Sequence, residues 1–171
     1  MIVDVEMAAP EFECLRCGTC CKTILQTADG VVRGLPLTEK ERRLFPPEVV
    51  SPRVAVGVEA PETVVLWQLN RNVCLFVGEG NVCQRYEVRP LMCRSFPIVV
   101  GAISNKCTVF SYRKPGVAYS EPYTMESQLE ADEKLTVYIK KSIKKYSRKG
   151  LKMWEYDLAT CSWVNEQKVS I

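Results

Sequence analysis

Cysteine placement is the feature that most constrains how this chain of 171 residues can fold. The chain has nine cysteines and no histidine. Eight of the cysteines form a compact group and then a spread group: Cys14, Cys17, Cys20 and Cys21, followed by Cys74, Cys83, Cys93 and Cys107. Thiolates are soft ligands, and four of them suit zinc, iron or an iron–sulfur cluster. The pattern therefore predicts a metal-binding fold in which the second group covers the first and shares ligands with it.

Composition and the N-terminal residues favour a reduced, cytoplasmic protein. Nine cysteines in 171 residues are about 5% of the chain, below the roughly 8–10% of short secreted disulfide scaffolds. Residues 1–10 carry acids and no long apolar run, so no signal peptide is expected. No stretch approaches the ~20 apolar residues that a membrane helix needs. In the cytoplasm thiols stay reduced, and clustered cysteines bind metal more often than they form disulfides.

The first cysteine group is crowded. It contains two overlapping C-x2-C units, and each unit can hold one metal ion with two sulfurs. Gly18 allows the sharp turn that lets these sulfurs converge. Adjacent cysteines usually point in different directions, so one of Cys20 and Cys21 is a candidate to serve a second metal or to bridge two. The ninth cysteine, Cys161, is expected to be a buried free thiol that packs as a small hydrophobic side chain.

The middle of the chain reads as short strands. Runs rich in β-branched residues predict strands at 54–58, 63–69, 73–77, 82–86, 98–103 and 107–112. The glycine-rich turn at 78–81 would join two of them into a hairpin. Such a hairpin would bring Cys74 and Cys83 close together across the two strands.

Two short helical segments are also expected. Thr38 and Glu41 have the spacing of a capping box, which predicts a helix ending near Pro46. Cys93 lies in a short helical turn between Pro90 and Pro97, and the two prolines would fix its geometry.

Residues 120–149 predict a long helix, because apolar residues recur at helical spacing, acids come early and bases come late. Gly150 follows as a helix-terminating residue, and the tail 151–171 cannot be assigned. The fold class is therefore α+β: a small single domain with short antiparallel strands around a cysteine-ligated metal centre and a long C-terminal helix. Residues 1–115 are expected to form the cysteine domain, and 116–171 a helical extension packed on it as one compact unit.

Two sequence signatures together resemble a known family. They are C-x2-C-x2-C-C followed by C-x8-C, and the segment R-P-L-M-C-R-S-F-P at 89–97. These resemble the CxxCxxCC family of cysteine-cluster proteins, also called YkgJ-like, over about residues 12–110. The resemblance implies a zinc- or iron-chelating domain, similar to one in flagellin lysine methylases for which an iron–sulfur cluster is invoked. It carries over to Cys14, Cys17, Cys20, Cys21, Cys74, Cys83 and Cys93. Cys107 is the eighth candidate ligand, although no glycine follows it as the family pattern would have.

Arginines near the second cysteine group have a predicted supporting role. Arg85, Arg89 and Arg94 flank Cys83 and Cys93. Guanidinium groups can hydrogen-bond thiolate sulfurs and offset their charge, a role expected for Arg89 and Arg94. Surface solubility or pairing with Glu87 is the alternative. The formal net charge of +3 counts every thiol as neutral. Eight thiolates would make the chain negative, so part of the basic excess is expected to balance sulfur rather than to attract nucleic acid.

No catalytic constellation is evident, and three functions stay open. Histidine is absent, and so are the phosphate loop, the dinucleotide fingerprint and the C-x3-C-x2-C spacing of radical enzymes that use S-adenosylmethionine. The favoured function is a cytoplasmic protein that binds zinc, iron or an iron–sulfur cluster. The first alternative is an iron–sulfur redox protein or a metal-dependent enzyme. The second is a nucleic-acid or protein adaptor with structural zinc, contacting its partner through Lys140, Lys141, Lys144 and Lys145; a solvated helix end is the favoured interpretation of those lysines.

Overall fold

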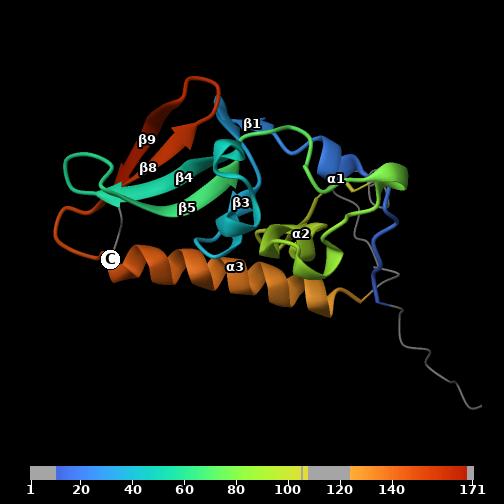
Figure 1. Cartoon of the computed structure of the whole chain (residues 1–171). Helices are drawn as coiled ribbons and strands as arrows, with labels where there is room; N and C mark the ends of the chain where they lie inside the picture. The colour runs from blue at the N-terminus through green and yellow to red at the C-terminus, as the bar shows by residue number, and fades with distance from the viewer. Residues whose placement is uncertain (1–10, 105, 108–123, 169–171) are drawn as a thin grey trace, which may run out of the picture.

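The protein combines an antiparallel sheet, a long helix and an irregular cysteine-rich region (Figure 1). The structure is a computed structural model that describes residues 11–104, 106–107 and 124–168. Residues 1–10 and all but the first residue of the strand predicted at 107–112 lie outside this part of the chain. The described residues confirm the predicted α+β fold class.

The main sheet has five antiparallel strands in the order β3-β5-β4-β8-β9. Their bounds are β3 Pro36–Leu37, β4 Val50–Gly57, β5 Thr63–Leu69, β8 Lys152–Asp157 and β9 Ser162–Lys168. Two small hairpins pair β1 Gln26–Ala28 with β2 Val31–Arg33, and β6 Ile98–Val99 with β7 Ala102–Ile103. The α-helices are α1 Thr19–Lys22, α2 Leu91–Ser95 and α3 Glu126–Lys145. Short 3₁₀ turns are η1 Glu41–Leu44, η2 Pro47–Val49, η3 Glu79–Asn81 and η4 Tyr86–Val88.

The strands predicted at 54–58 and 63–69 are β4 and β5, which pair with each other. Their β-branched side chains bury one face of the sheet, where Val56 and Val65 are 1% and 5% exposed. The register slips between Pro52 and Val54, so Arg53 is an extra residue in β4. Such bulges bend a strand and turn a side chain away from its regular direction.

The tail, which the sequence left unassigned, completes the sheet. β8 pairs with the free edge of β4, and β9 pairs with β8. Buried positions do not alternate along β8, because its pairing with β9 slips between Met153 and Glu155. A strand is predicted from a sequence by strict alternation of apolar and polar residues. Because the register shift interrupts that alternation, the sequence pattern did not predict β8.

The long helix is confirmed and runs beneath both the sheet and the cysteine-rich region (Figure 1). Ile143 and Tyr146 pack against the cluster formed by Val56, Val65 and Leu151. Gly150 follows with a positive φ of 79°, as predicted for a helix-terminating residue. Lys140, Lys141, Lys144 and Lys145 are all exposed. In the described part of the chain, no helix has both the length and the apolar character needed to cross a membrane.

Three strand predictions were wrong, those at 73–77, 82–86 and 98–103. Residues 98–103 form the hairpin β6–β7 instead of one strand, because Asp132 of α3 accepts hydrogen bonds from the turn N–H groups of Val100 and Gly101, at 3.0 and 2.9 Å. Residues 73–86 form no regular strand pair. They retain one bridge between Val77 and Cys83, flanked by the 3₁₀ turn η3.

The capping box is confirmed, but it opens the 3₁₀ turn η1 rather than an α-helix. The Thr38 N–H donates to Glu41 Oε2 at 2.8 Å, and the Glu41 N–H donates to Thr38 Oγ1 at 3.3 Å. The turn ends at Phe45, the residue before Pro46, as predicted.

Candidate metal centre

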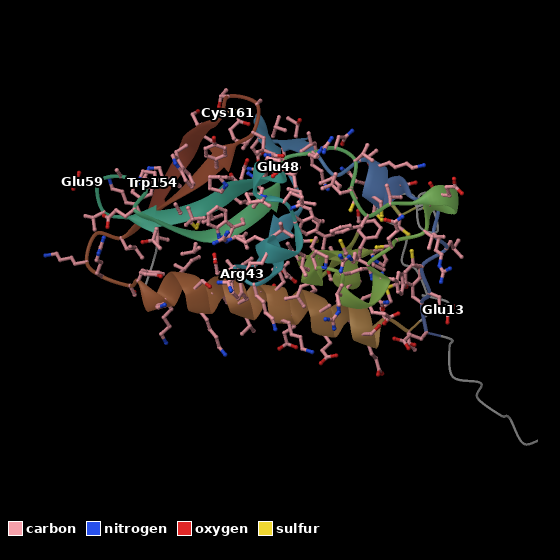
Figure 2. The ribbon with its side chains drawn as sticks, viewed as in Figure 1. Glu13, Arg43, Glu48, Glu59, Trp154 and Cys161 are labelled. Atoms are coloured by element: carbon pink, nitrogen blue, oxygen red, sulfur yellow. The ribbon has the colours of Figure 1, made fainter. Side chains whose placement is uncertain are left out.

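All eight cysteines that the sequence singles out line one cavity of about 560 Å³. They come from α1 and the residues before it, from the loop after β5, from α2 and from the segment after β7. Figure 2 shows sulfur atoms gathered near α1 and α2, at the end of the molecule opposite the β8–β9 hairpin. Cysteines nearly a hundred positions apart in the sequence therefore share one space.

Hydrogen bonds join the two cysteine groups directly. The Cys74 N–H donates to the Cys21 carbonyl at 2.8 Å. The Asn81 side-chain amide donates to the Cys17 carbonyl at 3.2 Å. Each contact ties one cysteine of the first group to the loop that carries Cys83, so the loop holds the first group in place.

The turn of the first group depends on Gly18, as predicted. Its φ is 77°, and its carbonyl accepts the N–H groups of Cys21 and Lys22 at 3.1 and 2.9 Å to start α1. A Cβ at this position would lie 2.7 Å from the Asn81 side chain. The site therefore needs glycine both for its backbone conformation and for the close approach of the clamping loop.

We expect Gly18→Ala to weaken metal binding by about tenfold or more and to destabilise the protein by about 1–3 kcal/mol. Alanine in a left-handed conformation costs about 1–2 kcal/mol, and the contact with Asn81 adds to that cost. Metal competition titrations and thermal melts measure both effects. Gly30→Ala is the matched control, since its φ is 75° and no atom lies within 4 Å of the added Cβ. Equal metal affinity in the two variants would show that the Asn81 contact is unimportant.

Cys93 is placed by α2, as predicted. Pro90 precedes the helix, and the Leu91 N–H donates to Glu41 Oε1 at 2.6 Å. Glu41 therefore uses one carboxyl oxygen for its own capping box and the other for the start of the helix that carries Cys93. This second role had no signal in the sequence.

The adjacent thiols of Cys20 and Cys21 form an unequal pair. Their sulfurs lie 3.8 Å apart. The hydrogen bond from Cys20, with the positive charges of Arg89 and Lys22, lowers the pKa of Cys21 to about 7 against the opposing effect of burial. The same hydrogen bond, burial and the neighbouring thiols raise the pKa of Cys20. One thiolate thus forms readily near neutral pH, while the second needs a further cation.

Deeper thiols behave like Cys20. Burial, followed by the charges of Cys21 and Cys74, raises the pKa of Cys93. Burial is also the main cause that raises the pKa of Cys74, whose sulfur accepts the Phe76 N–H at 3.4 Å. Several thiolates so close together are stable only when a bound cation offsets their repulsion.

Basic side chains surround the sulfurs. Seven of them line the cavity, and no acidic side chain of the described residues does: Arg16, Arg33, Arg43, Arg53, Arg85, Arg89 and Lys106. The Arg89 guanidinium stacks 3.5 Å from the centre of the Tyr86 ring, and its Nε donates to the Tyr86 carbonyl at 2.8 Å. Its charge favours the thiolate forms of Cys21 and Cys93, although burial raises the pKa of Cys93 overall. The role of Arg89 beside the thiolates stays a prediction.

Arg94 lies elsewhere. It is exposed on α2 and does not line the cavity. Arg85, which flanks Cys83 in sequence, does line the cavity, and so does Arg16. Arg16 had not been considered, and its place beside Cys17 in sequence was the available signal.

The donor chemistry fits zinc or iron, because eight soft sulfurs share the cavity and no carboxylate of the described residues lines it. Within the described ranges, no three Cys, Asp or Glu side chains are grouped closely enough to hold one ion. Binding would therefore require the thiols to move closer together around the metal, for example by changing side-chain rotamers.

The ninth cysteine was predicted wrongly. Cys161 is exposed in the turn between β8 and β9, with a φ of 50°, and its thiol donates to the Leu158 carbonyl at 3.7 Å (Figure 2). The tight turn, rather than apolar packing, determines its position. It does not line the cavity.

A family model described as CxxCxxCC, "Putative zinc- or iron-chelating domain", matches residues 13–137. Comparison with curated proteins and with solved structures gave no match. The matched range contains all eight cysteines of the cavity and the loop that clamps the first group. Since it covers well over half of the sequence, the chain belongs to the CxxCxxCC family.

Proposed function

We propose that this protein binds zinc or iron through the thiolates of its cavity and that the metal centre is part of its folded structure. One observation carries the proposal: eight thiols and seven basic side chains share a cavity that has no acidic side chain among the described residues. A tetrathiolate zinc or iron site carries excess negative charge, which such surroundings stabilise.

Cys93 is the proposed centre of the ligand set. Five of the cysteines that line the cavity are half-buried: Cys20, Cys21, Cys74, Cys83 and Cys93. After burial, the charges of Cys21, Cys74 and Cys83 raise the pKa of Cys93. We therefore assign these five thiols to the inner ligand group. Cys14 and Cys17 are exposed and Cys107 is buried, and these three would complete the coordination.

The metal is expected to contribute to folding. Its ligands come from segments separated by long stretches of chain, and the first group makes few apolar contacts of its own, since α1 buries no residue. Binding that joins such segments appears directly as folding free energy. One ion that joins these segments also closes several loops of the chain, which lowers the conformational entropy of the unfolded state.

Anaerobic purification followed by elemental analysis and an absorption spectrum tests the proposal. We expect one or two metal ions per chain, and removal of the metal with a chelator should lower the melting temperature by at least about 10 °C. Zinc without visible absorbance supports a structural centre. Protein without bound metal that also fails to take up zinc or ferrous iron would overturn the proposal.

An iron–sulfur centre is the second candidate. The Arg16 N–H donates to Cys14 Sγ at 3.4 Å, and the Phe76 N–H donates to Cys74 Sγ at the same distance. Hydrogen bonds to sulfur tune the potential of iron–sulfur clusters. Iron with acid-labile sulfide and a brown colour that bleaches on reduction would favour this candidate over zinc.

A further inference from the structure

The cavity is large for a metal and its ligands. Its volume of about 560 Å³ lies within the roughly 300–1,000 Å³ of small-molecule sites, which are mostly apolar with a few placed polar groups. Part of its wall is apolar: Leu35, Phe45 and Phe76 line it and belong to the same hydrophobic cluster as Cys74. The Phe45 and Phe76 rings lie 5.0 Å apart. An apolar surface thus connects the sulfurs with the strand edge at Gly34.

Arg53 belongs to β4, the central strand of the main sheet, and reaches Gly34. It is the extra residue of the β4 bulge, it lines the cavity, and its Nη1 donates to the Gly34 carbonyl at 2.5 Å. Across the described residues, no carboxylate forms an ion pair with it. Burial lowers the pKa of Arg53 to about 10, and the charge of Glu155 opposes that effect. Arg53 is half-buried, and a partly desolvated cation without an ion pair favours a bound anion.

Neighbouring charges compensate Arg53 only in part. Arg33 and Glu155 form a bidentate pair at 2.5 and 2.6 Å, so the Glu155 carboxylate is already engaged. Glu155 stabilises the charge of Arg53, Arg33 opposes it more weakly, and burial outweighs both. Arg43, another basic residue of the cavity wall, lies 3.7 Å from Glu39. Arg53 is thus the cation at this end of the cavity whose charge remains open to a ligand.

We propose that the cavity binds a small organic carboxylate, with its acid group on Arg53 and its apolar body along Leu35, Phe45 and Phe76 toward the cysteines. A single unpaired guanidinium suits one negative charge, and its planar fork matches a carboxylate. The apolar wall excludes a small, fully hydrated anion as the best ligand, because the wall would remain unfilled. The site extends the proposed metal centre, since both share one cavity, but Arg53 itself takes no part in metal coordination.

Calorimetric titration of the full-length, metal-analysed protein with 2-naphthoate tests this site, with naphthalen-2-ylmethanol as the uncharged control ligand. We expect the carboxylate to bind at least about tenfold more tightly than the alcohol. Arg53→Gln should weaken naphthoate binding about 10- to 100-fold, the range of a hydrogen bond to a charged group. Arg71→Gln is the matched control, because Arg71 is exposed and does not line the cavity. It should leave binding unchanged.

Three results would overturn the site: no naphthoate binding, no preference over the alcohol, or unchanged affinity in a folded Arg53→Gln variant. If that variant fails to fold, the ligand comparison in the wild-type protein still decides. Metal content is measured on the same samples, so the two proposals fail separately. Protein that contains metal but does not bind naphthoate would support the metal centre and contradict the carboxylate site. Protein that binds naphthoate through Arg53 but contains no metal would support the carboxylate site and contradict the metal centre.

Discussion

Cys93→Ser should abolish stable metal binding and lower the melting temperature by at least about 10 °C. Serine is close in shape but is a poor ligand for zinc or iron, which bind thiolates strongly. Cys93 lines the cavity with the other seven cysteines and belongs to the proposed inner group, so its loss removes one of the proposed ligands. Elemental analysis of the purified variant and a thermal melt measure the two effects.

Cys161→Ser is the control for that experiment. Its thiol is exposed and lies outside the cavity, so metal content and melting temperature should match the wild type. A Cys93→Ser variant with full metal content and the melting temperature of the wild type would show that Cys93 is not a ligand. It would contradict the proposed inner ligand group.

Gly34→Ala should prevent folding or remove most of the stability, which is about 5–15 kcal/mol for a typical domain. The added Cβ would lie 1.6 Å from the Leu69 carbonyl oxygen, a backbone atom that cannot move aside. The Gly34 N–H also donates to the buried Gln68 side chain at 2.8 Å, so a shift of this segment would leave polar groups unpaired. Soluble yield and circular dichroism would show the loss.

Gly78→Ala provides the comparison, because its Cβ would meet only the flexible, exposed Gln84 side chain at 3.0 Å. Its cost should stay below about 1 kcal/mol. If Gly34→Ala melted within a few degrees of Gly78→Ala, the close packing of Gly34 on β5 would not matter for stability.

Local patterns predicted much of the fold and the candidate site. The capping box at Thr38, the two strands β4 and β5 and the long helix follow from nearest-neighbour chemistry, which acts over a few residues. The β8–β9 hairpin escaped prediction because its register slip breaks the alternation of buried residues. Turns stabilised from a distance, such as β6–β7 by Asp132, also leave no local signal.

The site shows the same division. Cysteine spacing identified eight residues that line one cavity, because a metal site requires a characteristic ligand type. The groups that position them are ordinary residues in their own segments. Asn81 looks like a turn residue and Glu41 like a helix cap, yet Asn81 holds Cys17 and Glu41 holds the start of α2. Only the three-dimensional fold reveals these contacts.

The pairing of β8 with β4 determines where the protein can be truncated without exposing a strand edge. The family match stops at residue 137, inside α3 and before either of the last two strands. A protein cut there would expose the backbone of Val54, Ala55 and Val56 along β4. An uncovered, apolar strand edge is a template for aggregation. Expression trials should therefore keep β8 and β9 together with the cysteine-rich part.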